Sequence, residues 1–105
     1  MADRILYRDV ITFPPLRFDL AFVVDEGVPA GDLLAAAREA GGEELQRIRF
    51  LSDYRGDQIP AGKKSIAFSV AFQAPDRTLS DEDAARLRQA IVSALAAAFG
   101  ADLRA

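Results

Sequence analysis

An alternation of large and small side chains over residues 65–72 is the feature that most constrains the fold of this chain. Serine or alanine alternates there with the large apolar residues Ile66, Phe68, Val70 and Phe72. Successive side chains of a β-strand point to opposite faces of its sheet, so one face here is bulky and apolar and the other is small. The apolar face needs a covering layer, and we therefore expect helices elsewhere in the chain.

Two segments have the periodicity of amphipathic helices. The first follows Pro29, which suits a first helical turn, and ends at Gly41 and Gly42. The second follows Ser80, a typical N-cap residue with Asp83 three positions later. Its large apolar residues recur every fourth position, at Leu87, Ile91, Leu95 and Phe99, and Gly100 is expected to end the helix. Each helix therefore has one apolar stripe to place against a sheet.

The remaining segments complete a known order of elements. We predict strands over residues 16–24, 45–54 and 65–72, a polar loop over 55–62 and a short last strand within 101–104. The order is strand, helix, strand, strand, helix, strand, which is the ferredoxin-like βαββαβ pattern of the α+β class. We expect an antiparallel sheet with two helices on one face and the other face open. Residues 1–12 are interpreted as an irregular lead-in, and residues 13–105 as one domain.

Composition narrows the chemistry. The 105 residues include no histidine, cysteine or asparagine, so zinc sites built on thiolate or imidazole and nucleophiles activated by histidine are excluded. We expect no catalytic and no metal-binding residues in this chain. No apolar stretch reaches membrane-spanning length and no signal peptide is visible, so we expect a cytoplasmic protein without a membrane partner. The net charge of −3 means that any nucleic-acid binding depends on a local basic patch.

The small face of the third strand, continued by Ala21 on the first, would let a flat partner approach the sheet closely. Cations gather near one end of this face: Arg47, Arg49, Arg55, Lys63 and Lys64. Tyr54 lies among them, and an aromatic ring with neighbouring cations suits an unstacked base and its phosphates. We expect Arg49, Arg55, Lys63 and Lys64 to approach phosphates. The alternatives are a solvated face, or a face that packs on another domain.

Several short motifs resemble those of one known family, over roughly residues 7–104. They are Phe13-Pro14 with Asp19-Leu20-Ala21 and Val23-Val24-Asp25, then Tyr54-Arg55-Gly56, Ile59-Pro60, Gly62-Lys63-Lys64-Ser65, Pro75-Asp76-Arg77-Thr78-Leu79 with Asp81-Glu82, and the ending Gly100 to Arg104. Their order and spacing resemble the ferredoxin-fold anticodon-binding domain found at the C-terminus of bacterial phenylalanyl-tRNA synthetase beta subunits.

The resemblance implies that the domain holds the anticodon stem-loop of phenylalanine tRNA. Positions that contact the first anticodon base in the family correspond here to Ala21, Tyr54 and Ser65, and Asp19 of the same first-strand motif is a further RNA-binding candidate. Catalysis would take place in the synthetase alpha subunit, so ATP and magnesium would belong to the parent enzyme and not to this domain. The alpha subunit and the rest of the beta subunit would be partners if the chain is a fragment.

Two positions depart from the family pattern. Phe18 stands where the family usually has arginine, and Ser52 stands where it commonly has aspartate. The first change removes an expected positive charge, and the neighbouring Asp53 is a candidate to compensate for the second. A ferredoxin-like protein-interaction or regulatory module without RNA binding therefore stays an alternative. A small enzyme of the acylphosphatase type is disfavoured, because that activity uses an asparagine.

Overall fold

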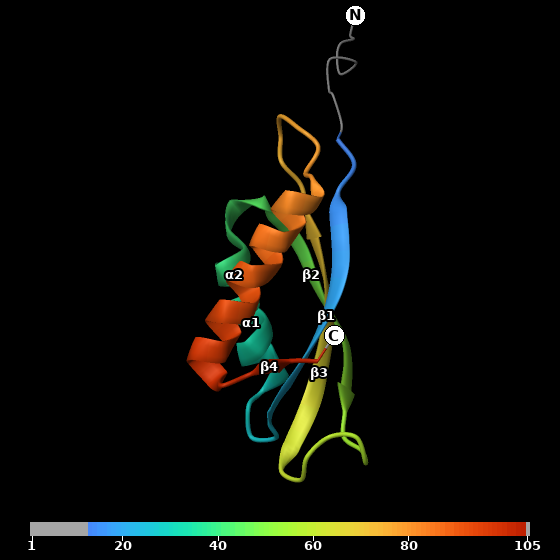
Figure 1. The fold of residues 1–105 in the computed structure, drawn as a ribbon, viewed down its shortest axis with the longest axis vertical. Helices are drawn as coiled ribbons and strands as arrows, with labels where there is room; N and C mark the ends of the chain where they lie inside the picture. The colour runs from blue at the N-terminus through green and yellow to red at the C-terminus, as the bar shows by residue number, and fades with distance from the viewer. Residues whose placement is uncertain (1–12, 105) are drawn as a thin grey trace, which may run out of the picture.

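The computed structural model describes residues 13–104, which form a layer of helices packed on one sheet (Figure 1). The elements follow one another as β1 (Leu16–Asp25), α1 (Ala30–Gly41), η2 (a 3₁₀ turn, Gly42–Glu44), β2 (Leu45–Tyr54), β3 (Lys63–Phe72), α2 (Asp81–Phe99) and β4 (Asp102–Leu103). Figure 1 shows α1 and α2 on the same side of the sheet. No described element covers the opposite face, which we call the open face.

The strand order across the sheet is β2-β3-β1-β4, and every neighbouring pair is antiparallel. β1 and β3 pair along their whole lengths, from Leu16 opposite Phe72 to Asp25 opposite Lys63. β4 adds two residues at the outer edge of β1. The α+β class and the βαββαβ order predicted from the sequence are confirmed.

The hydrophobic core lies between the sheet and the helices and is built from alternate strand residues. Phe22, Phe68 and Phe72 are fully buried, and the rings of Phe22 and Phe68 stack with their centroids 5.8 Å apart. The helices contribute the residues of their apolar stripes: Leu33, Leu87, Ile91 and Leu95. Since successive strand residues alternate between the faces, the small residues of β3 are left on the open face.

The ends of the elements follow the local signals closely. α1 ends at Gly41, and the following Gly42 has a φ of 73°, which favours glycine over other residues. β3 begins at Lys63, two residues before the predicted strand, and β4 is shorter than its predicted range. The predicted lead-in over residues 1–12 lies outside the described residues. Within residues 13–104, neither helix combines the length and the apolar character that a bilayer crossing requires.

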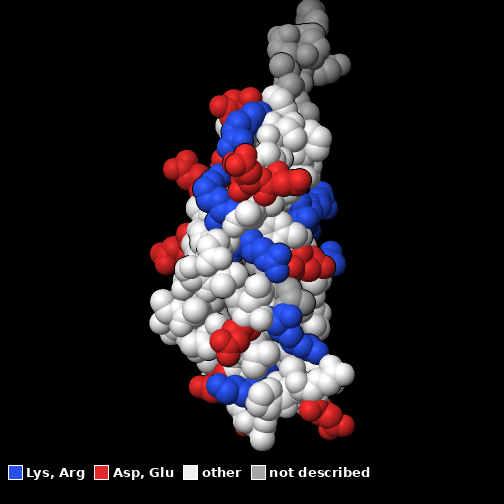
Figure 2. All heavy atoms as spheres, in the orientation of Figure 1, with Lys and Arg blue, Asp and Glu red and all other residues white. Residues whose placement is uncertain are grey.

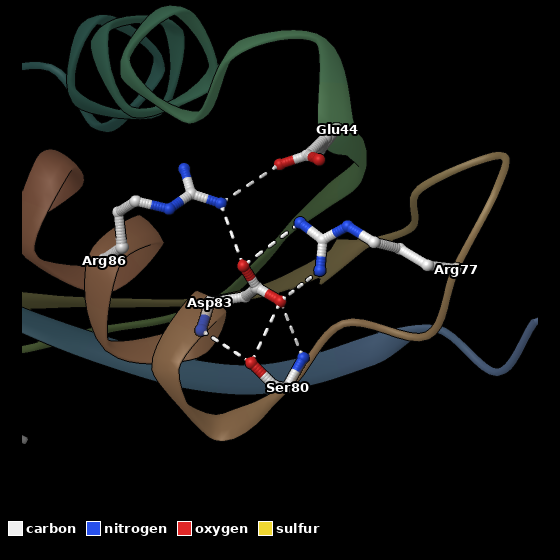
Figure 3. A network of polar contacts seen from close by, with 5 residues as sticks. All are labelled: Glu44, Arg77, Ser80, Asp83 and Arg86. Atoms are coloured by element: carbon white, nitrogen blue, oxygen red, sulfur yellow. Dashed lines mark hydrogen bonds and ion pairs between the residues drawn. The ribbon is translucent and has the colours of Figure 1, made fainter.

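The start of α2 is held by a polar network (Figure 3). The Ser80 hydroxyl accepts a hydrogen bond from the Asp83 N–H at 3.2 Å, and the Asp83 carboxylate accepts one from the Ser80 N–H at 2.8 Å. This reciprocal pair is the capping box predicted from the sequence. Arg77 and Arg86 also donate to Asp83, at 2.6 and 3.2 Å, and Arg86 lies 3.6 Å from Glu44 of η2. The ion pair with Arg77, followed by the Ser80 N–H, holds the pKa of the Asp83 carboxyl well below its usual range.

Candidate nucleic-acid interface

The open face is organised as rows of residues that lie side by side across β1, β3 and β2. From one end of the sheet to the other the rows are Arg17–Ala71–Arg47, Asp19–Ser69–Arg49, Ala21–Ala67–Ser52 and Val23–Ser65–Tyr54. The central residue of every row is a serine or an alanine on β3. The middle of the face is therefore a shallow trough along β3, with longer side chains on the neighbouring strands.

A β-bulge in β2 brings the aromatic and the basic side chains onto the same face. Arg49 lies opposite Ser69 and Tyr54 lies opposite Ser65, with a register shift between Phe50 and Ser52. An unbroken strand alternates strictly, so it would place an odd-numbered and an even-numbered residue on opposite faces. Leu51 is the extra residue of the bulge, and it shifts the alternation by one position for the residues that follow. Arg49 and Tyr54 consequently both project from the open face.

Arg104, which directly follows β4, joins the residues of the last two rows. Its backbone N–H donates to the Ala21 carbonyl at 2.7 Å. Its guanidinium group donates to the Ser65 hydroxyl at 3.4 Å and to the Gln58 side chain at 3.2 Å. The same guanidinium lies 5.6 Å from the centre of the Tyr54 ring, within the range of a cation–π contact. The three positions expected to meet the first anticodon base are thus brought together by a fourth residue.

The side chains of this row differ in accessibility. Ser65 is 2% exposed, with the Arg104 guanidinium against its hydroxyl, whereas Tyr54 is 43% exposed. The ring of Tyr54 also lies close to Gly56, where an added Cβ would fall 2.2 Å from the Tyr54 hydroxyl oxygen. A glycine at position 56 therefore leaves room for this ring position. An incoming base would meet the Tyr54 ring and the Arg104 guanidinium before it met Ser65.

Three of the cations expected to approach phosphates are engaged or buried. Lys63 forms an ion pair with Asp25 at 2.9 Å, and this hydrogen bond, more than the accompanying charge attraction, raises the pKa of the lysine. Arg55 pairs with Asp53 at 2.9 Å. Lys64 is 5% exposed and belongs to the alternate set of β3 residues that faces the helices. The position of Lys64 argues against the predicted phosphate contact, because alternation along β3 turns it away from the open face.

Arg49 and Asp19 retain the placement expected from the sequence. Both line a shallow hollow of about 260 Å³ on the open face, together with Arg17, Arg47, Leu51, Ser69, Val70 and Ala71. Elsewhere, Figure 2 shows acidic and basic side chains interspersed over the visible surface, and several basic side chains project at its right-hand margin, on the side away from the helices. The whole chain has a net charge of −3, so a region of positive potential can exist only where basic side chains gather locally.

Comparison with known proteins agrees with this geometry. Residues 12–104 match the model of the ferredoxin-fold anticodon binding domain. The chain belongs to this family. It is 48% identical over 98 residues to the phenylalanine–tRNA ligase beta subunit of Bifidobacterium longum, an alignment that covers 93% of this chain and 11% of that protein. It is 41% identical over 103 residues to the corresponding subunit of Geobacillus kaustophilus, covering 98% of this chain and 13% of that protein.

The relatives are much longer than this chain, which spans only about an eighth of their length or less. The family resemblance seen in the motifs is confirmed over nearly the whole chain. The comparison thus establishes this chain as an anticodon-binding domain of the kind carried by ligase beta subunits, that is, as a binding domain.

The two departures from the family pattern have clear positions in the structure. Phe18 stacks on Phe72, with the ring centroids 5.7 Å apart, so it belongs to the core side of the sheet. Ser52 lies on the open face opposite Ala67. Asp53, considered as a replacement for the aspartate missing at position 52, points to the other side of β2 and pairs with Arg55 instead.

Arg104 was not among the candidate site residues predicted from the sequence. It is separated from Ser65 by 39 positions, and no local periodicity links the two. A weak signal was present, because the segment Gly100–Arg104 matched the family ending and Arg104 is the sole basic residue after α2. Arg104 reaches the site because β4 pairs with β1, and this pairing of distant segments is what the local sequence does not show.

Proposed function

We propose that this anticodon-binding domain holds the anticodon stem-loop of phenylalanine tRNA on its open face and serves as the tRNA-recognition module of a phenylalanine–tRNA ligase beta subunit. The observation that carries the proposal is the convergence of Ala21, Ser65, Tyr54 and Arg104 at one end of the face. Family membership supplies the nature of the ligand, and the small centre of the sheet supplies the space for it.

The row containing Tyr54 has the chemistry to receive one unstacked base. The exposed Tyr54 ring offers a stacking surface, and stacking is favourable for any base. The Arg104 guanidinium presents donors beside that ring and can read acceptors on a base edge. Ala21 and Ala67 have no side chain beyond Cβ, so a base can approach the strands closely. In this proposal Ser65 orients Arg104, to which it is hydrogen-bonded, and does not contact the base itself.

The domain contributes binding and positioning in this proposal. Aminoacylation, with its requirement for ATP and magnesium, takes place at a site in the alpha subunit, and the alpha subunit and the rest of the beta subunit are the protein partners. Because phosphate contacts position an RNA while contacts to base edges specify it, the domain's selectivity lies with Arg104, and stacking on Tyr54 contributes affinity.

The proposal is tested by measuring the affinity of the 105-residue chain for two RNA stem-loops that differ only in the anticodon. One carries the phenylalanine anticodon, and the other carries an altered first anticodon base. Tyr54→Ala is compared with Phe50→Ala, a matched control on the same strand with nearly the same exposure, 46% against 43%, but on the other face.

We expect the phenylalanine anticodon to bind more tightly, and Tyr54→Ala to weaken that binding by roughly 5- to 150-fold, the range of about 1–3 kcal/mol for one stacked base. Phe50→Ala should change the affinity less than twofold. Equal affinities for the two stem-loops, or equal effects of the two variants, would overturn the proposal.

A further inference from the structure

We infer that the hollow lined by Arg17, Arg47 and Arg49 holds a backbone phosphate of the bound RNA, at a second anchoring point separate from the base-binding row. This inference rests on the proposed function, because it takes the RNA to be the ligand. The arginines of the hollow take the place of Lys63 and Lys64, the two lysines at the start of β3 that the sequence suggested as phosphate contacts.

The geometry of the hollow comes from the register of the sheet. Arg17 and Arg47 flank Ala71 in one row, and Arg49 follows in the next row, opposite Ser69. Neighbouring strands are about 4.8 Å apart, so the Cα atoms of Arg17 and Arg47 are separated by about 10 Å. The alanine between them has a short side chain, which leaves the space above it to the two guanidinium groups. Both can therefore approach a single anion from opposite sides.

The charge and the chemistry of these side chains suit a phosphate. All three arginines are exposed, and within residues 13–104 no ion pair engages any of them. Their combined charge outweighs the single carboxylate of Asp19 in the hollow. A guanidinium group is planar, always charged and able to bind a phosphate through two parallel hydrogen bonds. The two lysines at the start of β3 lack this freedom, because Lys63 is paired with Asp25 and Lys64 is buried.

The distance between the hollow and the base-binding row shows that the two sites serve different parts of the RNA. Ser65 and Ala71 mark the two sites on β3 and are six residues apart, which corresponds to about 20 Å along a strand. One nucleotide cannot span that length. The RNA must therefore run along the trough of β3, with a base at Tyr54 and the backbone of a neighbouring segment at the arginines.

The test measures the salt dependence of binding to the phenylalanine-anticodon stem-loop. The double variant Arg17→Gln/Arg47→Gln, which removes two positive charges from the hollow, is compared with Arg38→Gln, which removes one positive charge from the exposed surface of α1 on the helical side. The double variant Arg17→Lys/Arg47→Lys keeps the charge at the hollow. Thermal unfolding of each variant verifies that the fold is retained.

We expect the glutamine double variant to reduce the slope of log affinity against log salt concentration by about 0.7, since one phosphate contact on a single strand accounts for about that much of the slope. Arg38→Gln and the lysine double variant should keep the wild-type slope. The ratio of affinities for the two anticodons should stay unchanged in every case, because phosphates carry no sequence information.

A glutamine double variant with the slope of Arg38→Gln would overturn the inference, whether or not the wild-type chain distinguishes the two anticodons. Failure of the wild-type chain to distinguish them would overturn the proposed function alone. A fall in the anticodon ratio in the glutamine double variant would also contradict the inference, since it would place the arginines at a base.

Discussion

Replacing Ser80 with alanine tests whether the capping box of α2 stabilises the domain. The substitution removes the acceptor of the Asp83 N–H at 3.2 Å and the hydroxyl that donates to the Asp83 carboxylate at 3.0 Å. Loss of an N-cap serine typically costs about 1 kcal/mol of unfolding free energy. For a domain of this size, that loss lowers the unfolding temperature by roughly 4–8 °C.

The measurement is thermal and urea-induced unfolding, followed by circular dichroism. Ser93→Ala is a matched control, since it makes the same chemical change in the same helix. Ser93 lies in the helix interior and accepts a hydrogen bond from Gln89 at 3.0 Å. Alanine has the higher helix propensity, so this variant should be as stable as the wild type or slightly more stable.

Equal unfolding temperatures for Ser80→Ala and Ser93→Ala would refute the reasoning, because the network at the start of α2 would then contribute nothing beyond a solvated serine. RNA binding offers a second check. The network lies on the helical side of the sheet, away from the open face (Figure 3). Ser80→Ala should therefore leave RNA affinity unchanged at a temperature where the variant is folded.

Three further variants probe the acid stability, the site and the core. The lowered pKa of Asp83 stabilises the fold at pH values above the ordinary carboxyl pKa of about 4, and this contribution is lost as the pH falls below it. Asp83→Asn should thus lose less stability than the wild type between pH 7 and pH 3 in urea unfolding. Gly56→Ala should displace the Tyr54 ring and weaken RNA binding severalfold, with little change in unfolding temperature. Phe68→Ala should lower the unfolding free energy by about 3–5 kcal/mol.

The elements of the fold were predictable because each has a local signal. Alternation over residues 65–72 marks a strand with one apolar face, and spacing of four residues after Ser80 marks a helix. The glycines at positions 42 and 100 end the helices with positive φ angles, as the sequence indicated. Each of these signals acts within a few residues, so it is readable without knowledge of the tertiary structure.

The site was less predictable, because it depends on register and on ion pairs between distant residues. Alternation alone places Arg49 and Tyr54 on opposite faces of β2, and the bulge at Leu51 that aligns them has no clear sequence signal. The ion pair of Lys63 likewise depends on strand pairing, because its partner Asp25 lies directly opposite it on the neighbouring strand β1. Composition identifies cations, but the pairing of strands decides which of them are available to a ligand.

The serine and alanine residues on the open face of β3 are an unusual choice for a strand. Serine and alanine are poorer strand formers than the β-branched residues that an ordinary solvated face favours. β3 tolerates them because it lies in the interior of the sheet, pairs on both edges and buries Ile66, Phe68, Val70 and Phe72 on its other face. The large side chains thus offset the weak strand propensity of the small ones. Small residues of weak strand propensity are expected on a sheet face where a partner must approach the backbone closely. The alternation that determines the fold therefore also shapes the surface proposed to bind RNA.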